Sequence, residues 1–222
     1  MEFGMPSPTK KRRTKKTNDK LWEAYFSKIK KRLNEPISNT SREGGFTKIF
    51  DYLKTKKNPI IVETGCYREV DNYEGDGCST LLFDEFIEIY GGTLLSVDTD
   101  PEACELARKN TFHAEVANQD SIEFLSTLEG AVDLLYLDSC NIDDWTNDWE
   151  AASHHLKELF AAKNVIKPGT LIVVDDNMPN PIENIISLRI GKGRLINELM
   201  SALDIEPYIN DYQMGWIWKE LD

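Results

Sequence analysis

From Asn58 onward, short runs rich in β-branched residues alternate with longer runs of helical periodicity. PIIVET is followed by STLLFDEFIEIY, and the alternation continues through TLLSVD, VDLLYLD and TLIVVDD. Strands that are apolar throughout must be covered on both faces, which is typical of a mostly parallel sheet between two helical layers. The last two runs, IEPYIN and QMGWIWKE, have no helix between them and predict an antiparallel hairpin at one edge.

The chain divides into three regions by composition. Its 222 residues, 41% of them hydrophobic, are enough for one sizeable core. Residues 1–20 form a basic tail without apolar anchors, which we expect to be disordered. Residues 21–57 predict a helical extension whose apolar stripe packs on the domain, caps the ligand site or forms a homodimer contact, and residues 58–222 hold the α/β domain. The stripe consists of Trp22, Tyr25, Phe26, Ile29 and Leu33.

The charge is unevenly distributed. The formal net charge is -12, but Met1–Lys20 hold seven of the 26 basic residues and two of the 38 acidic ones, which leaves -17 on the rest. Such an acidic body repels phosphate backbones, so we expect no nucleic-acid partner except through the basic tail.

No apolar run is long enough to span a membrane, and no secretion signal follows the basic stretch, so we expect a soluble, cytoplasmic protein. The four cysteines show no C-x-x-C pair and suit a reducing compartment, with a Cys66–Cys78 disulfide as the alternative.

The segment ETGCYREVDNYEGDGCST connects the first strand to the first helix of this domain, where doubly wound folds bind their ligands. Gly65 allows the backbone to approach a ligand, and residues 67–76 look like an inserted polar flap, a candidate lid. The acidic residues of the loop repel phosphate, and no G-x-x-x-x-G-K-[ST] motif is present. A cationic ligand such as S-adenosylmethionine suits this loop better than a nucleotide phosphate. Its candidate cofactor-binding residues are Glu63, Thr64, Gly65, Cys66, Ser79 and Thr80, of which the last two could instead cap the helix.

Two further motifs follow the second and third predicted strands. SVDTDP places Asp98 and Thr99 at a strand end, where a carboxylate can accept hydrogen bonds from both ribose hydroxyls. NQDS places Asp120 and Ser121 before a helix, where they bind adenine, cap the helix, or do both.

The motifs VETG, SVDTDP, NQDS, YLDS and IKPGTLIVVDDN occur in an order that resembles the Rossmann-like S-adenosylmethionine-dependent methyltransferases, over Asn58 to Glu220. The resemblance implies a doubly wound seven-stranded sheet, mostly parallel, with an antiparallel edge hairpin at the C-terminus. It also implies S-adenosylmethionine as the cofactor and methyl transfer as the reaction. An NAD-binding oxidoreductase and a non-catalytic binding protein on the same scaffold remain the alternatives.

Acidic residues end the fourth and fifth predicted strands. Because the carboxyl ends of parallel strands lie at one edge, these side chains should converge there, and clustered carboxylates favour Mg²⁺, Mn²⁺ or Ca²⁺. The pattern is similar to that of metal-dependent O-methyltransferases. The catechol and caffeoyl-CoA type implies Asp138, Asp176 and Asn177 as ligands, and the macrolide or sugar type implies Asp175 and Asp176 beside Asp138. The same residues could also simply end the strands.

A bound ion would lower the pKa of an acceptor hydroxyl on a sugar-like, polyhydroxylated or phenolic small molecule. The catechol type carries a lysine base three residues after its first metal ligand, where this chain has Asn141. Asparagine cannot accept a proton at neutral pH, so the base remains open. The catalytic candidates are Asp138, through the ion, and Asp143, Asp144 and His155. Trp145 and Trp149 line an acceptor site or pack in the core, and Lys192 and Arg194 of RIGKGRL bind an anionic acceptor group or begin a helix.

Overall fold

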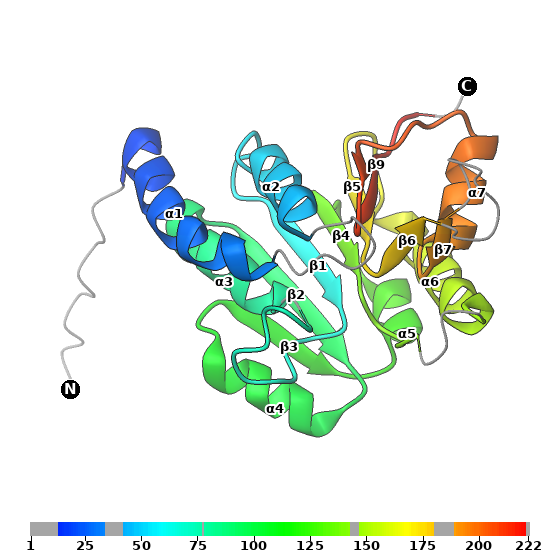
Figure 1. Ribbon diagram of the computed structural model, residues 1–222, viewed down its shortest axis with the longest axis horizontal. Coiled ribbons are helices and arrows are strands. Elements are labelled where there is room, and N and C mark those ends of the chain that lie inside the picture. The colour runs from blue at the N-terminus through cyan, green and yellow to red at the C-terminus, as the bar shows by residue number, and fades with distance from the viewer. Residues whose placement is uncertain (1–12, 34–41, 77, 143–146, 180–188, 221–222) are drawn as a thin grey trace, which may run out of the picture.

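A seven-stranded sheet forms the centre of the protein (Figure 1). The computed structural model describes residues 13–33, 42–76, 78–142, 147–179 and 189–220. The strand order is β3-β2-β1-β4-β5-β9-β8, with β1 to β5 parallel and β9 antiparallel to both β5 and β8. This confirms the predicted sheet and its C-terminal edge hairpin. The strands are β1 Ile60–Thr64, β2 Thr93–Asp98, β3 Ala114–Asn118, β4 Leu134–Leu137, β5 Leu171–Val174, β8 Ile209–Asn210 and β9 Met214–Ile217.

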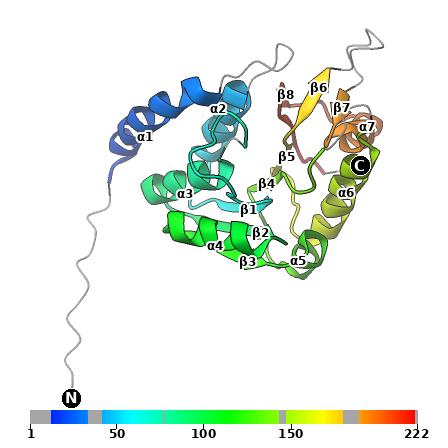
Figure 2. The same cartoon turned by 60° about the horizontal axis from the view of Figure 1, so that its bottom comes forward.

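Helices cover both faces of the sheet (Figure 2). One face carries α1 (Lys15–Ile29), η1 (Lys30–Leu33), α2 (Arg42–Leu53) and α3 (Ser79–Tyr90). The other carries α5 (Ser121–Thr127), α6 (Trp149–Ala161), η2 (Ala162–Asn164) and α7 (Arg194–Ala202). Helix α4 (Pro101–Asn110) lies against β2 and β3. None of the helices in the described part of the chain is long and apolar enough to cross a membrane.

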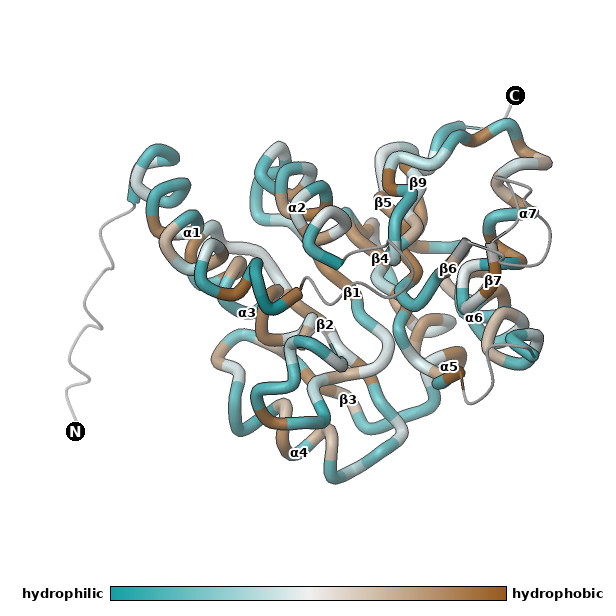
Figure 3. Tube along the Cα trace, viewed as in Figure 1, coloured by the Kyte–Doolittle hydropathy of each residue, from teal (hydrophilic) through white to brown (hydrophobic). Residues whose placement is uncertain are grey.

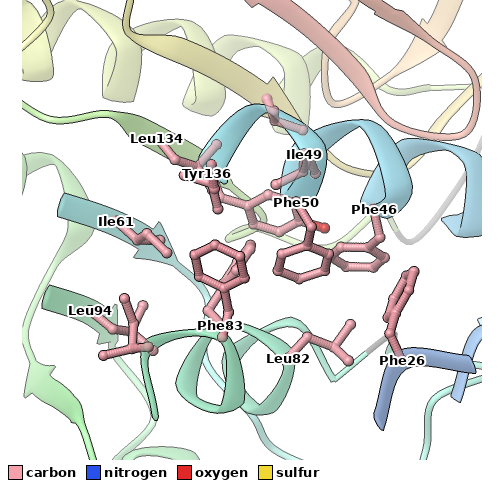
Figure 4. Close-up of a cluster of buried hydrophobic side chains, with 14 of the residues drawn as sticks. Phe26, Phe46, Ile49, Phe50, Ile61, Leu82, Phe83, Leu94, Leu134 and Tyr136 are labelled. Carbon is pink, nitrogen blue, oxygen red and sulfur yellow. The ribbon is translucent and has the colours of Figure 1, made fainter. Parts of the chain in front are cut away.

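Aromatic side chains form a contiguous part of the core on the first face (Figure 4). Phe46 and Phe50 of α2 pack with Phe83 of α3, and the ring of Tyr136 on β4 stacks near Phe46 at 6.0 Å between centroids. Trp22 of α1 reaches the same cluster, 4.4 Å from the ring of Phe50. The predicted apolar stripe of the extension therefore packs on the domain itself.

The first helix also corrects the predicted extent of the basic tail. Helix α1 begins at Lys15, inside the segment expected to be disordered, and the Thr14 side chain accepts a hydrogen bond from the amide of Thr17. This side chain satisfies one of the backbone donors left open at the helix start. Residues 1–12 of the tail lie outside the described residues.

The second face has a mainly aliphatic core. Residues of β4 and β5 that alternate with those of the first core point to this side and pack with α6 and α7, as expected for strands buried on both faces. Figure 3 shows hydrophobic segments along the strands and hydrophilic ones over the connecting loops. The helices carry both along their length, which is the pattern that packs them against the sheet.

A second, two-stranded sheet was not predicted. It pairs β6 (Asn177–Pro179) with β7 (Arg189–Gly191) in antiparallel register, directly after β5 and before α7. Gly191 has φ 115°, and a Cβ there would lie 2.1 Å from the carbonyl oxygen of Asp176. Only glycine allows this close approach. The pairing brings the GKG segment of RIGKGRL to the end of β5.

Candidate functional site

A cavity of about 430 Å³ lies at the carboxyl ends of β1 to β4. The strand order reverses between β1 and β4, and such a switch point is where open α/β sheets bind ligands. The residues that line it are Gly65, Cys66, Tyr67, Arg68, Asp76, Cys78, Ser79, Val97, Asp98, Thr99, Asp100, Ala103, Gln119, Asp120, Ser121, Asp138, Ser139, Cys140, Asn141 and His154.

The loop after β1 holds the backbone against the neighbouring strand ends. Gly65 has φ 80°, and a Cβ there would lie 2.4 Å from the carbonyl oxygen of Asp138. The next amide, of Cys66, donates to Oδ2 of Asp98 at 3.0 Å, while the amide of Asp100 donates to Oδ1 at 2.9 Å. Because both oxygens are held by backbone donors, the Asp98 carboxylate has a fixed orientation at the cavity wall.

A polar network forms another part of the cavity wall. Asp120 caps α5 by accepting from the amide of Glu123 at 3.0 Å, and Oγ of Ser121 lies 3.2 Å from Nε2 of His154. The same imidazole nitrogen lies 3.4 Å from Oε1 of the fully buried Glu158. Glu158 raises the pKa of His154, and the pKa of Glu158 falls to about 2 because its hydrogen bonds and charged neighbours outweigh its burial. The protonated imidazole is thereby favoured at the cavity wall.

The flap, residues 67–76, supplies one cation to this acidic cavity. Nη2 of Arg68 lies 2.9 Å from Oδ1 of Asp76, and Nη1 donates to Oδ1 of Asn141 at 2.9 Å. Among the described residues that line the cavity, Arg68 is the one lysine or arginine. Arg68 thus places a guanidinium among the carboxylates of Asp76, Asp98 and Asp138.

The N-terminal extension holds the flap from outside. Arg32 lies 2.6 Å from Oδ1 of Asp71 and 2.8 Å from Oε1 of Glu74. Arg42 donates to the carbonyl oxygen of Gly75 at 2.6 Å. The described part of the extension therefore contacts the flap as well as the core, although it does not line the cavity itself.

A buried group of charges lies beside the cavity, at the ends of β4 and β5. Nζ of Lys192 lies 2.6 Å from Oδ1 of Asp138 and 2.8 Å from Oδ2 of Asp176. Arg42 lies 3.2 Å from Oδ2 of Asp175 and 3.1 Å from Oδ1 of Asp176. Each of the three carboxylates thus has a cation of the chain within ion-pair distance.

Burial and these cations act on the three acids in opposite directions. Burial raises the pKa of Asp138 and of Asp175 above the usual value. Burial acts in the same direction on Asp176, but Lys192 and Arg42 together outweigh it and lower the pKa of Asp176. Asp138 and Asp176 in turn raise the pKa of Lys192 against the effect of its own burial. Lys192 is therefore a permanent cation at neutral pH.

Comparisons with known proteins agree on the fold. Residues 74–177 match a family model described as a methyltransferase domain. The chain has the Rossmann-like methyltransferase fold. The SAH-bound methyltransferase PaMTH1 of Podospora anserina is 16% identical, with a TM-score of 0.52 over 98% of this chain and 100% of that one. The cofactor-bound protein Rv0187 from MTB is 14% identical, with a TM-score of 0.53 over 95% of this chain and 100% of that one. A search of curated proteins found no significant match.

Within this methyltransferase fold, the predicted metal centre needs correction. Asp138 and Asp176 share the Lys192 ammonium, and Asp175 accepts from Tyr136 at 2.8 Å. The side chain of Asn177 is fully buried, with its oxygen bound to the amide of Gly193 at 2.8 Å. Among the residues that the structure describes, no three His, Cys, Asp or Glu side chains are arranged to hold a metal ion. The four predicted ligands do not fit a divalent ion, because each already has a side-chain oxygen bound by a cation or a hydrogen-bond donor of the chain.

The predicted cofactor residues separate into two sets. Seven of them line the cavity: Gly65, Cys66, Ser79, Asp98, Thr99, Asp120 and Ser121. Thr64 and Thr80 are fully buried and do not line it. Asp120 caps α5 as one alternative predicted, and it also lines the cavity, so binding of adenine there stays a prediction.

Glu63 is also placed behind the cavity rather than at its wall. Its carboxylate is fully buried and accepts from the hydroxyls of Ser79, Thr80 and Ser96 at 2.5 to 2.7 Å. Burial raises the pKa of Glu63 to about 7, against the effect of these hydrogen bonds. Ser79 and Thr80 therefore bind Glu63 and join α3 to β1, and neither caps the helix.

Of the catalytic candidates that the structure describes, Asp138 lines the cavity and His155 does not. His155 is fully buried on α6, where Nδ1 lies 2.7 Å from the carbonyl oxygen of Ala151, and burial lowers its pKa to about 4. Its neighbour His154 lines the cavity instead. Asp143, Asp144 and Trp145 lie outside the described residues.

The other acceptor candidates pair with one another. Arg194 lies 2.9 Å from Oδ1 of Asp148, and its guanidinium lies 4.2 Å from the ring of Trp149.

Cys66 and Cys78, which could have formed a disulfide, are free and share a small apolar cluster with α4.

Sequence reasoning missed Arg68 and Arg42 as cations of the site and did not assign Lys192 its present partners. Arg68 could have been found, because it is the cation at the start of a flap that is otherwise acidic. Lys192 was considered only as a group for an acceptor, and Arg42 not at all. Their partners lie far away along the chain, and no local pattern connects them.

Proposed function

We propose that this protein binds S-adenosylmethionine and transfers its methyl group to a hydroxyl of a small-molecule acceptor. The main support for the proposal is the cavity at the switch point, because its carboxylates surround a space suited to a cationic, phosphate-free ligand. The match of residues 74–177 to a methyltransferase domain supports methyl transfer as the reaction.

In this proposal, the cavity binds each part of the cofactor by different chemistry. Asp98, held by two backbone amides, accepts hydrogen bonds from the ribose hydroxyls. Asp120 and Ser121 contact the adenine. Arg68 pairs with the methionine carboxylate, for which the rest of the wall offers no lysine or arginine among the described residues. The nearby carboxylates favour the sulfonium and ammonium charges.

The reaction is a displacement in line at the methyl carbon. The acceptor oxygen forms a bond to this carbon as the carbon–sulfur bond breaks, and the sulfonium becomes the neutral thioether of S-adenosylhomocysteine. The hydroxyl proton leaves to a base, and Asp138 at the cavity wall takes it in this proposal. A hydroxyl acceptor suits the sequence LDSCN after β4, which lacks the Asn/Asp-Pro-Pro-aromatic run of amino-directed nucleic-acid methylases.

Calorimetry tests the cofactor. S-adenosylhomocysteine should bind the full chain at about one site, and Asp98→Asn should weaken it about tenfold because one ribose hydrogen bond to a charged group is lost. Transfer of a labelled methyl group to a panel of sugars and phenols then tests the acceptor class. Binding of NAD with no binding of S-adenosylhomocysteine would instead favour an oxidoreductase.

A further inference from the structure

The GKG segment delivers a cation to the position where a divalent ion was predicted. A Cβ on Gly191 would meet the carbonyl oxygen of Asp176 at 2.1 Å, and one on Gly193 would meet Oδ1 of Asn177 at 2.5 Å. The amide of Lys192 donates to the carbonyl oxygen of Asp176 at 3.1 Å. The two glycines thus let the backbone lie directly on the end of β5, with Lys192 between them.

The same contacts use the oxygens that an ion would need. The side-chain oxygen of Asn177 accepts a hydrogen bond from the amide of Gly193. Asp138 and Asp176 both lie within ion-pair distance of the Lys192 ammonium. Lys192 is 1% exposed, so its charge depends on these two carboxylates for compensation. A buried ammonium that loses its partners is strongly destabilising.

We propose that Lys192 is a built-in cation that takes the place of a divalent metal between Asp138 and Asp176, and that it positions Asp138 at the cavity wall. Lys192 does not line the cavity and acts through Asp138, so it is a positioning residue. The role of Asp138 at the cavity wall rests on the proposed function. The assignment of Lys192 as the cation between Asp138 and Asp176 does not depend on that function.

The geometry explains why a metal would not displace this lysine. Mg²⁺ requires oxygen ligands at about 2.0–2.1 Å in near-octahedral arrangement. An ion between Asp138 and Asp176 would lie where Nζ now lies, 2.6 and 2.8 Å from their oxygens. Two like charges cannot share that position in a buried site. Lys192 would have to leave, and its backbone is held by hydrogen bonds from its own amide to Asp176 and from the amide of Gly193 to Asn177.

Removal of the charge should therefore create a metal site. Lys192→Met keeps most of the side-chain length and leaves Asp138 and Asp176 without their shared cation. We expect no Mn²⁺ binding by the wild-type chain in electron paramagnetic resonance titrations, and no change in Tm with Mn²⁺ or EDTA. Lys192→Met should have a lower Tm than the wild type and should bind Mn²⁺. Added Mn²⁺ should restore part of the lost Tm. Lys163→Met, at an exposed lysine, is the control and should behave as the wild type does.

The wild-type titration keeps the proposal falsifiable if Lys192→Met does not fold. Mn²⁺ binding by the wild type that Asp176→Asn abolishes would overturn the proposal, and so would a folded Lys192→Met that binds no Mn²⁺. S-adenosylhomocysteine binding is measured on the same samples. A wild type that binds neither ligand would contradict the proposed function while leaving the assignment of Lys192 intact.

Discussion

Arg68 of the flap donates a hydrogen bond of 2.9 Å to Oδ1 of Asn141 in the segment after β4, and both residues line the cavity. The bond joins two walls that are far apart in the sequence. Asp76, which also holds Arg68, fixes the guanidinium inside an acidic environment. Residues of the flap therefore form part of the cavity wall.

Arg68→Ala should reduce affinity for S-adenosylhomocysteine but not for 5′-methylthioadenosine, which lacks the amino-acid part. Loss of a charge-assisted hydrogen bond corresponds to a roughly 10- to 100-fold weaker Kd. Calorimetry with both ligands measures the difference. Arg108→Ala is the control, since Arg108 bonds the backbone of Val116 and does not line the cavity. An equal loss for the two ligands would show that Arg68 does not bind the carboxylate.

Glu63→Gln should change how stability depends on pH. The folded-state pKa of Glu63 is about 7 against the ordinary 4.5, so protonation favours the folded state and wild-type stability falls as pH rises between these values. At 1.36 kcal/mol per pKa unit, the loss is about 3 kcal/mol above pH 7. Glutamine has no proton to lose, so the free energy of unfolding of Glu63→Gln should not show this part of the decline. Urea unfolding at pH 4.5 and pH 8 measures the difference. The exposed Glu115→Gln should keep the wild-type profile, and the same slope in Glu63→Gln would refute the prediction.

Arg32→Ala should release the flap without unfolding the domain. Arg32 pairs with Asp71 and Glu74 at a partly exposed position, where ion pairs contribute little to global stability. We expect faster amide hydrogen exchange within residues 67–76 and an almost unchanged Tm. Lys31→Ala, at the exposed neighbouring position, should leave the exchange unchanged. Unaltered exchange in Arg32→Ala would mean that other contacts hold the flap.

Trp22→Ala should destabilise the whole domain. Trp22 is 1% exposed and lies against Phe26, Phe50 and Phe86, with ring centroids 4.4 to 5.3 Å apart. Truncation of a buried tryptophan costs about 3–5 kcal/mol through lost burial and the cavity left behind. Urea unfolding measures the loss, and Leu21→Ala, at a residue that is 40% exposed, should have a small effect. Equal effects of the two changes would mean that α1 is not part of the core.

The architecture could be predicted because its signals are local. A strand that is apolar throughout must be covered on both faces, and the absence of a helix before QMGWIWKE requires a hairpin. Gly65 and Asp98 were found for the same reason, since a turn after β1 and a carboxylate at the end of β2 follow from chain order in a parallel sheet. The pair β6 and β7 was missed, because three-residue strands carry almost no periodicity.

The sequence by itself determined that carboxylates gather at one rim of the sheet, because parallel strands present their carboxyl ends on the same side. Only the tertiary structure decided what neutralises them. Lys192 and Asp138, like Arg42 and Asp175, are far apart along the chain, and they meet only after α2 and the GKG segment have packed against the sheet. Residue order predicts how many charges must be compensated at this rim, whereas packing determines which cation reaches them.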